Sequence, residues 1–548
     1  MWRSLASYIK CALSTILLTL SIAAWASPTI TVASPKAGTV GAPTYFDATA
    51  STSTCAAGIS AVRIYTAPGV AAFTTNSPHL ETFLKLKPGS YNTVIQAWDN
   101  CGASSKFPIT ISVTAAAGVH VFLPAAGSNN TPVHFAASAE NPACAAGISA
   151  VRIYPAPGVN AFTSSGNTLD AFVNLLPGTY NAVAQAWDNC GHVFKTALTI
   201  KNNGGSPGKF LYIADNGLKN IARYQLNAGT LTNANGASNV PPVASVPSEP
   251  NSIAVDPPGN LAYAGLTDGR VAVFNINRAT GALFRKTLIA APGVGPASVT
   301  VDSSGNFLLV AEAGSQDVTS YWVNRSDGTL TKIGTVSAGV DPNSIVTDFS
   351  GRFVYASNFK SDDISAYSLN SETGKLTPVS GSPFLAGDQA VALAATGKYV
   401  YTLNSSGGSA SGFTINSSTG SLSPIPGSPF PEGECCSTNG MAVDPIHNLF
   451  FYSTIAFTFG TDSITSSVIQ PNGSLFGGGG GFTEGVFGPT SIVLDPSYQF
   501  IYVSQVNGFS DQPQILSIKY SSTNGSGSIF SGPILRPGAE PIQLAVSR

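Results

Sequence analysis

Charged side chains are scarce in this chain. Of its 548 residues, 26 are lysine or arginine and 28 are aspartate or glutamate, so only 10% are charged, against about 25% in ordinary globular proteins. Phosphate binding needs clustered lysine and arginine, so this composition argues against a nucleic-acid partner. The five histidines show no metal-ligand spacing, and no phosphate or calcium loop is present, so we expect no metal and no cofactor.

Signals for helices are also nearly absent. The 56 glycines and 37 prolines punctuate short runs of valine, isoleucine, tyrosine and phenylalanine, many of which alternate between apolar and polar positions. That pattern is typical of strands joined by turns, so the sequence predicts an all-β fold. With so little charge, its polar surface must be built from serine, threonine, asparagine and glycine.

Residues 1–26 have the features of a secretory signal peptide. Arg3 and Lys10 precede an apolar run, and Ala24-Trp25-Ala26 fits a small-x-small cleavage site. The run is too short to cross a bilayer, and no later segment is long enough for a membrane helix. We therefore expect a secreted, periplasmic or cell-surface protein with no membrane span after signal removal. Its 24 basic and 28 acidic side chains would then give a net charge of −4.

A tandem repeat follows the signal. CAAGISAVRIY occurs at 55–65 and 144–154, and QAWDNCG at 96–102 and 185–191, both with an offset of 89 residues. A repeat of that length suits a duplicated two-sheet β-sandwich. The phrases LKPGSYNTVIQAWD and LLPGTYNAVAQAWD resemble bacterial immunoglobulin-like (Ig-like) modules. This resemblance implies two Ig-like domains, residues 28–115 and 118–202, that serve as spacers or adhesion modules.

Six cysteines remain after the signal, an even number that suits an oxidising compartment. The duplication reproduces a separation of 46 residues, so we pair Cys55 with Cys101 and Cys144 with Cys190. Closing each loop would contribute about 4 kcal/mol in the chain-entropy model. A bond between the adjacent Cys435 and Cys436 would be strained. If bonded, the pair would make its loop rigid or form a stiff apolar surface for a ligand, and if not bonded it is two inert thiols. The sequence leaves these alternatives open.

A second repeat occupies the rest of the chain. GKFLYIA at 208, GNLAYAG at 259, GNFLLVA at 305, GRFVYAS at 351, GKYVYTL at 397, HNLFFYS at 447 and YQFIYVS at 498 give seven occurrences at intervals of 46 to 51 residues. Such a period fits one four-stranded blade per repeat of a β-propeller, here residues 207–548.

Another strand precedes six of these seven phrases, for example NSIAVDP at 251 and TSIVLDP at 490, but none precedes the first. PIQLAV at 541–546 matches the missing strand. We therefore predict that the C-terminal strand completes the first blade and closes the ring without a free sheet edge.

The phrases P-N-S-I-x-x-D-x-x-G-x-x-V-Y and Tyr-x-Leu-Asn-x-x-Thr-Gly-x-Leu-Thr resemble the seven-bladed lactonase propellers, the 6-phosphogluconolactonase-like and YVTN-repeat proteins. The resemblance implies lactone hydrolysis, and its enzymes carry an Arg-His pair after the proline that enters an inner strand. No Arg-His pair stands at those positions here. We therefore favour a secreted binding module for a carbohydrate or cell-surface ligand, with a lactone hydrolase of this family as the alternative.

Polar residues in the loops at one axial mouth are the candidate ligand-binding residues, because propellers place substrates there. They are Glu249, Glu312, Asn343, Asn358, Asp388, Glu434, Asn439, Asn507 and Glu540. No catalytic residue can be assigned among them. We interpret His79, His120, His134 and His192 as surface or core residues, and His447 as structural.

Overall fold

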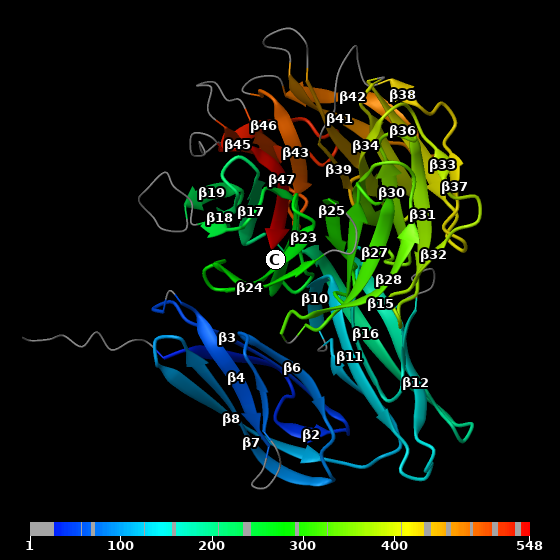
Figure 1. Cartoon of the computed structure of the whole chain (residues 1–548). Helices are drawn as coiled ribbons and strands as arrows, with labels where there is room; N and C mark the ends of the chain where they lie inside the picture. The colour runs from blue at the N-terminus through cyan, green and yellow to red at the C-terminus, as the bar shows by residue number, and fades with distance from the viewer. Residues whose placement is uncertain are drawn as a thin grey trace, which may run out of the picture.

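The computed structural model describes residues 27–55, 57–66, 72–124, 127–155, 161–206, 208–233, 243–290, 295–325, 327–406, 408–431, 440–455, 462–482, 486–506, 513–531 and 539–547. Every helix or strand in these ranges is a β-strand, which confirms the all-β prediction. Within them, no helix could cross a membrane. The predicted signal peptide lies outside the described residues. Figure 1 shows the N-terminal sheets (blue and cyan) below a larger ring of sheets (green to red).

The first repeat forms two facing sheets, with strand orders β1-β3-β6 and β2-β8-β7-β4-β5. Their inward side chains, such as Phe46, Val62 and Ile95, form one buried core. The strands are β1 (Thr29–Ser34), β2 (Gly38–Val40), β3 (Thr44–Ser51), β4 (Ile59–Tyr65), β5 (Phe73–Thr75), β6 (His79–Leu84), β7 (Gly89–Asp99) and β8 (Ser104–Val113).

The second repeat has the same order, β14-β11-β9 facing β10-β16-β15-β12-β13. Disulfides join Cys55 to Cys101 and Cys144 to Cys190, which confirms both predicted pairs. The strands are β9 (Gly118–Leu123), β10 (Gly127–Thr131), β11 (Val133–Glu140), β12 (Ile148–Tyr154), β13 (Phe162–Ser165), β14 (Thr168–Val173), β15 (Gly178–Asp188) and β16 (Val193–Gly205). We call the two repeats the first and second sandwich.

The remaining strands form seven sheets, each built on four antiparallel strands. The first four sheets contain β17 (Phe210–Asp215), β18 (Asn220–Asn227), β19 (Thr230–Asn233) and β20 (Val243–Ser245); β21 (Pro250–Val255), β22 (Leu261–Leu266), β23 (Arg270–Ile276) and β24 (Leu283–Ala290); β25 (Pro296–Val301), β26 (Phe307–Glu312), β27 (Asp317–Val323) and β28 (Leu330–Ser337); and β29 (Pro342–Thr347), β30 (Phe353–Asn358), β31 (Asp363–Leu369), β32 (Leu376–Pro378) and β33 (Phe384–Leu385).

The last three sheets contain β34 (Ala390–Ala395), β35 (Tyr399–Asn404), β36 (Ser409–Ile415), β37 (Leu422–Pro424) and β38 (Phe430–Pro431); β39 (Met441–Asp444), β40 (Leu449–Thr454), β41 (Ser463–Ile469) and β42 (Leu475–Phe482); and β43 (Pro489–Leu494), β44 (Phe500–Gln505), β45 (Gln514–Tyr520) and β46 (Gly527–Ser531). These are the blades of the propeller.

The C-terminal strand β47 (Pro541–Ser547) pairs with β17, with Leu544 opposite Ile213. It is the innermost strand of the first blade, and Figure 1 shows it in red beside the green β17. The inner strands β21, β25, β29, β34, β39 and β43 contact one another in this order, and β47 contacts both β43 and β21. The Gln543 side chain also accepts a hydrogen bond from the backbone N–H of Ile253 in the next blade (2.9 Å).

A substitution at Leu544 tests how strongly the stability of the propeller depends on β47. Its side chain is buried in a cluster with Leu211, Ile213 and Tyr502. Leu544→Ala should destabilise the propeller by about 2–5 kcal/mol, the usual cost of such a cavity. Lys519→Ala, at an exposed position on the regular strand β45, should change stability by less than about 0.5 kcal/mol. Thermal unfolding of both variants measures this, and equal effects would contradict the role of β47.

Candidate functional site

A partial ring of buried polar side chains stands where the second strand ends in five of the seven blades, whereas β22 ends in Leu266 and β40 in the half-buried Thr454. Asp215, Glu312, Asn358, Asn404 and Gln505 occupy this equivalent position and are all buried. Two of them, Glu312 and Asn358, are ligand candidates from the sequence. Their burial shows that these five side chains lie beneath the loops of the axial mouth rather than on its surface.

The ring residues bind loops and strands of their own blades. The carboxylate of Asp215 accepts hydrogen bonds from the backbone N–H groups of Leu218 (3.1 Å) and Glu540 (2.9 Å). The Asn358 amide donates to Asp363 (2.5 Å) and Ser365 (2.9 Å). These bonds compensate the burial of polar groups. Those to Asp215 fix the loops that follow β17 and precede β47, whereas those of Asn358 join β30 to its paired strand β31.

Glu249 lies in an ion pair that joins two blades. Its Oε1 is 2.7 Å from Lys219 Nζ, and its Oε2 accepts a hydrogen bond from Thr267 Oγ1 (2.7 Å). The hydrogen bond from Lys219, followed by that from Thr267, lowers the pKa of Glu249 to about 2. Glu249 is therefore a fixed anion and a weak general base.

The remaining candidates differ in exposure. Asn343 is half-buried and its Oδ1 accepts a hydrogen bond from Ser357 Oγ (3.0 Å). Asp388 and Glu540 are exposed. The structure places Asn343 and Asn358 on the paired strands β29 and β30. Glu434, Asn439, Asn507 and the pair Cys435-Cys436 lie outside the described residues.

The opposite end of the propeller axis has a cavity of about 360 Å³. The ends of all seven inner strands line it, with the side chains of Val255, Val301, Thr347, Ala395, Val443, Leu494 and Val546. Pro132 and Asn174 of the second sandwich complete the lining, and Asn174 Nδ2 donates to the Phe349 carbonyl (3.4 Å). The second sandwich therefore lies against this end of the axis.

The backbones of the second sandwich and the propeller approach each other closely at this end of the axis. A Cβ atom on Gly205, at the end of β16, would lie only 1.5 Å from the Pro496 carbonyl oxygen. Pro496 belongs to the turn between β43 and β44, which also lines the axial cavity. Any larger residue at position 205 would force the second sandwich away from the propeller.

Buried aspartates cap the turns on the same face. Asp256 Oδ1 accepts hydrogen bonds from the backbone N–H groups of Asn260 (2.7 Å) and Leu261 (2.9 Å), and Asp302 and Asp348 repeat the arrangement. The repeated Asp-x-x-Gly phrase is thus turn chemistry. His447 is similarly structural, with Nδ1 2.6 Å from Asp444 Oδ2.

Burial raises the pKa of Asp256 to about 6, although the Leu261 and Asn260 N–H groups and the charges of His79 and Arg325 oppose this shift. The folded-state pKa is above the ordinary value of 3.8, so the folded state binds the proton more tightly. The cost of the buried anion is therefore absent below about pH 4 and grows as the pH rises through 6.

Asp256→Asn should make the protein more stable above pH 6, because the amide keeps the acceptor oxygen without the charge. The gain in melting temperature should be a few degrees at pH 7.5 and should disappear near pH 4. Thermal scans of both proteins between pH 4 and 8 measure the gap. A gap that does not change with pH would contradict this assignment, and Asp327→Asn in a half-buried hairpin turn is the control.

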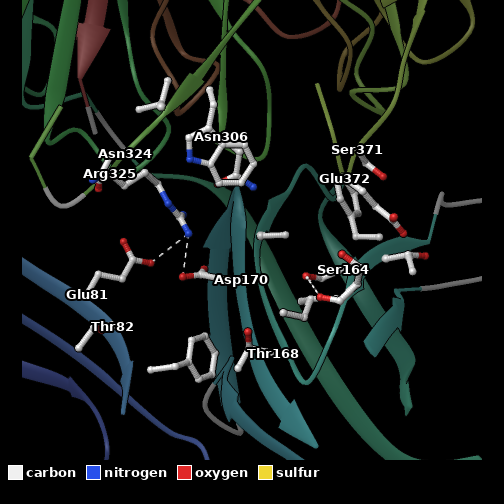
Figure 2. A pocket seen from close by; sticks show the side chains of 18 of the residues that line it. Glu81, Thr82, Ser164, Thr168, Asp170, Asn306, Asn324, Arg325, Ser371 and Glu372 are labelled. Atoms are coloured by element: carbon white, nitrogen blue, oxygen red, sulfur yellow. Dashed lines mark hydrogen bonds and ion pairs between the residues drawn. The ribbon is translucent and has the colours of Figure 1, made fainter. Parts of the chain in front are cut away.

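The sequence interpretation of the sandwich histidines missed a cluster. His79 and His134 lie with Asp47, Glu81 and Asp170 where both sandwiches meet the propeller, and Arg325 reaches Glu81 (3.3 Å) and Asp170 (2.7 Å). Figure 2 shows Arg325 above Glu81 and Asp170, at the edge of a cavity of about 400 Å³. The sequence repeat could have indicated this cluster, because Glu81 and Asp170 are acids at equivalent positions 89 residues apart.

Comparisons with known proteins agree with the architecture. Residues 206–391 and 342–437 match the family model "Lactonase, 7-bladed beta-propeller". A "putative 6-phosphogluconolactonase" from Bacteroides uniformis has a TM-score of 0.52 at 16% identity, covering 62% of this chain and 100% of that chain. A periplasmic gluconolactonase of Pseudomonas aeruginosa has a TM-score of 0.50 at 14% identity, covering 62% and 99%. A search of curated proteins gave no significant match. The family model and the neighbours support a lactonase-like propeller, and at these identities the solved structures show the fold alone.

Proposed function

We propose that this lactonase-like propeller hydrolyses the ring ester of a sugar lactone at the axial mouth that faces away from the sandwiches. The family match over residues 206–437 supports the reaction class. The observation that selects the mouth is the contact of Pro132 and Asn174 with the opposite axial cavity. A substrate that arrives from solvent needs the end of the axis that the second sandwich leaves uncovered.

The charges at this mouth favour a neutral lactone. Three cations in or next to the described loops between second and third strands pair with acids: Lys219 with Glu249 (2.7 Å), Lys360 with Asp341 (3.1 Å), and Arg270 with Asp268. A phosphorylated sugar needs unpaired cations to hold its phosphate. Unphosphorylated sugar lactones are therefore the proposed substrates.

Asp388 and Glu540 are the proposed general bases. Lactone hydrolysis needs a carboxylate that can activate water for attack on the ring carbonyl. Both side chains are exposed at the starts of inner strands, and neither carboxylate has a hydrogen bond or ion pair within the described part of the chain. Glu249, by contrast, is committed to Lys219 and Thr267.

The proposed location is outside the cytoplasm. Two disulfides are compatible with an oxidising compartment, and the predicted signal peptide gives a route there. The neighbour from Pseudomonas aeruginosa is called periplasmic. We also propose that the two sandwiches are Ig-like domains, a view supported by their repeated arrangement of a three-stranded and a five-stranded sheet.

Binding without hydrolysis is the second candidate function. The sequence favoured it, and the structure supplies one reason to keep it: Asp215 caps a loop and Glu249 forms an ion pair, so fewer mouth acids are available for catalysis. The family match supports hydrolysis at least as well. A carbohydrate bound at the mouth without turnover would favour binding.

Lactone hydrolysis by the full chain tests the proposal. Proton release from D-galactono-1,4-lactone and D-glucono-1,5-lactone should exceed the buffer rate, and a 6-phosphogluconolactone should be a poorer substrate. Replacing the base should lower kcat/KM by about 100-fold or more. Asp388→Asn and Glu540→Gln identify which carboxylate acts.

Asp327→Asn is the matched control, because Asp327 binds the N–H and hydroxyl of Thr329 in a hairpin turn between third and fourth strands. Its activity should equal that of the unchanged chain. If none of the three lactones is turned over above background, hydrolysis is wrong. Calorimetric titration with the same sugars in their open acid form then tests binding.

A further inference from the structure

The cluster at the meeting point of the three domains joins side chains from distant parts of the chain. Tyr45 on β3 and Glu81 on β6 come from the first sandwich, and His134 on β11 and Asp170 on β14 from the second. Arg325, in the turn after β27, comes from the propeller. All five side chains belong to elements that the proposed hydrolysis does not use.

The duplication explains how these groups meet. Tyr45 and His134 occupy equivalent positions of the two repeats, and so do Glu81 and Asp170, since each pair is 89 residues apart. Strand β3 contacts its equivalent β11. The two sandwiches thus present the same patch to each other, as the subunits of a symmetric dimer do.

Three oxygen atoms converge on one ring nitrogen. His134 Nε2 is 2.7 Å from Asp170 Oδ1, 3.4 Å from Glu81 Oε1 and 3.4 Å from Tyr45 Oη. Tyr45 Oη donates a hydrogen bond to Glu81 Oε1 (2.7 Å), so the single proton of a ring N–H serves Asp170 Oδ1, the nearest of the three oxygens. The donor atoms of Glu81, His134 and Asp170 all lie within 4.8 Å of one another, a spacing that one metal ion can bridge.

A second observation also points to a ligand. Glu81 Oε2 has no hydrogen-bond partner among the residues that the structure describes, and this side chain is only 5% exposed. A buried carboxylate oxygen without a partner is costly. The His79 Nδ1 atom lies 3.8 Å from Glu81 Oε2. That ring nitrogen already has a hydrogen-bond contact with the amide nitrogen of Asn260 (2.7 Å).

The charges in the cluster do not balance with neutral histidines. Asp47, Glu81 and Asp170 contribute three negative charges, and Arg325 contributes one positive charge. Two positive charges are missing. Either one divalent cation or two protons, one each on His79 and His134, would supply them.

We propose that Glu81, His134 and Asp170 bind one divalent transition-metal ion, with Tyr45 Oη as a neighbouring oxygen donor. Imidazole nitrogen with carboxylate oxygen suits Zn²⁺ and its neighbours in the first transition series better than Ca²⁺ or Mg²⁺. Arg325 contacts Asp170 through Oδ2, whereas His134 contacts Oδ1. The guanidinium therefore orients the Asp170 carboxylate through the oxygen that does not face His134. The ion would fasten the two sandwiches together beside the propeller.

Zinc titration of the full chain tests the site. The protein, without an affinity tag, is treated with EDTA, alkylated to block free thiols, and titrated with ZnCl₂ by calorimetry. We expect one zinc per chain and a higher melting temperature with zinc than without. Glu81→Gln and His134→Gln should each weaken zinc binding at least 100-fold. Circular dichroism verifies that both variants fold.

His192→Gln is the matched control, because His192 is a sandwich histidine whose Nδ1 lies 2.8 Å from Asp188 at an exposed position. It should leave zinc affinity unchanged. If the unchanged chain binds no zinc at 100 µM, protons rather than a metal balance the cluster and the proposal is wrong. Equal zinc affinity in Glu81→Gln, His134→Gln and His192→Gln would overturn it as well.

Discussion

The closure of the ring by β47 is the constraint on which the rest of the propeller depends. Seven inner strands contact one another around one axis, and two of these seven contacts, β43 with β47 and β47 with β21, exist because the last strand returns to the first blade. The bond from Ile253 N–H to Gln543 locks this strand to the blade beside it. Without β47, β17 would become a free sheet edge, and the apolar side chains that pack against Leu544 would be exposed. The position of each axial mouth follows from this closure.

The second sandwich then makes the two mouths unequal. It places Pro132 and Asn174 against the cavity at one end of the axis, and Gly205 allows the backbones to touch at Pro496. That end is lined by apolar strand ends such as Val301 and Val443. Covering them removes apolar surface from water, so the sandwich contributes to propeller stability as well as to its orientation. A spacer that merely extended from the propeller would do neither.

Much of this fold could be predicted because its determinants are local and repeated. The Asp-x-x-Gly phrase marks a turn in which Asp348 accepts the N–H groups of Arg352 and Phe353, so the sequence period equals the blade period. The disulfides followed from a separation that the duplication repeats. The docking of the second sandwich could not be predicted, since Asn174 and Gly205 carry no periodic signal. The Ig-like class of the sandwiches stays a prediction.

The site was harder to predict, because position along a strand does not reveal burial. Glu312 and Asn358 stand at the mouth end of their strands, as the repeat indicates, yet their side chains are buried. Asp388 and Glu540 belong to the same set of loops and are exposed. The His79 and His134 cluster was missed for a related reason. Each histidine is isolated within its own repeat, and only the contact between equivalent faces of the two repeats brings them together. Pairing the two copies residue by residue, which aligns the acid Glu81 with the acid Asp170, would have identified that face, because a half-buried acid that recurs in both copies needs a hydrogen-bond donor or a cation.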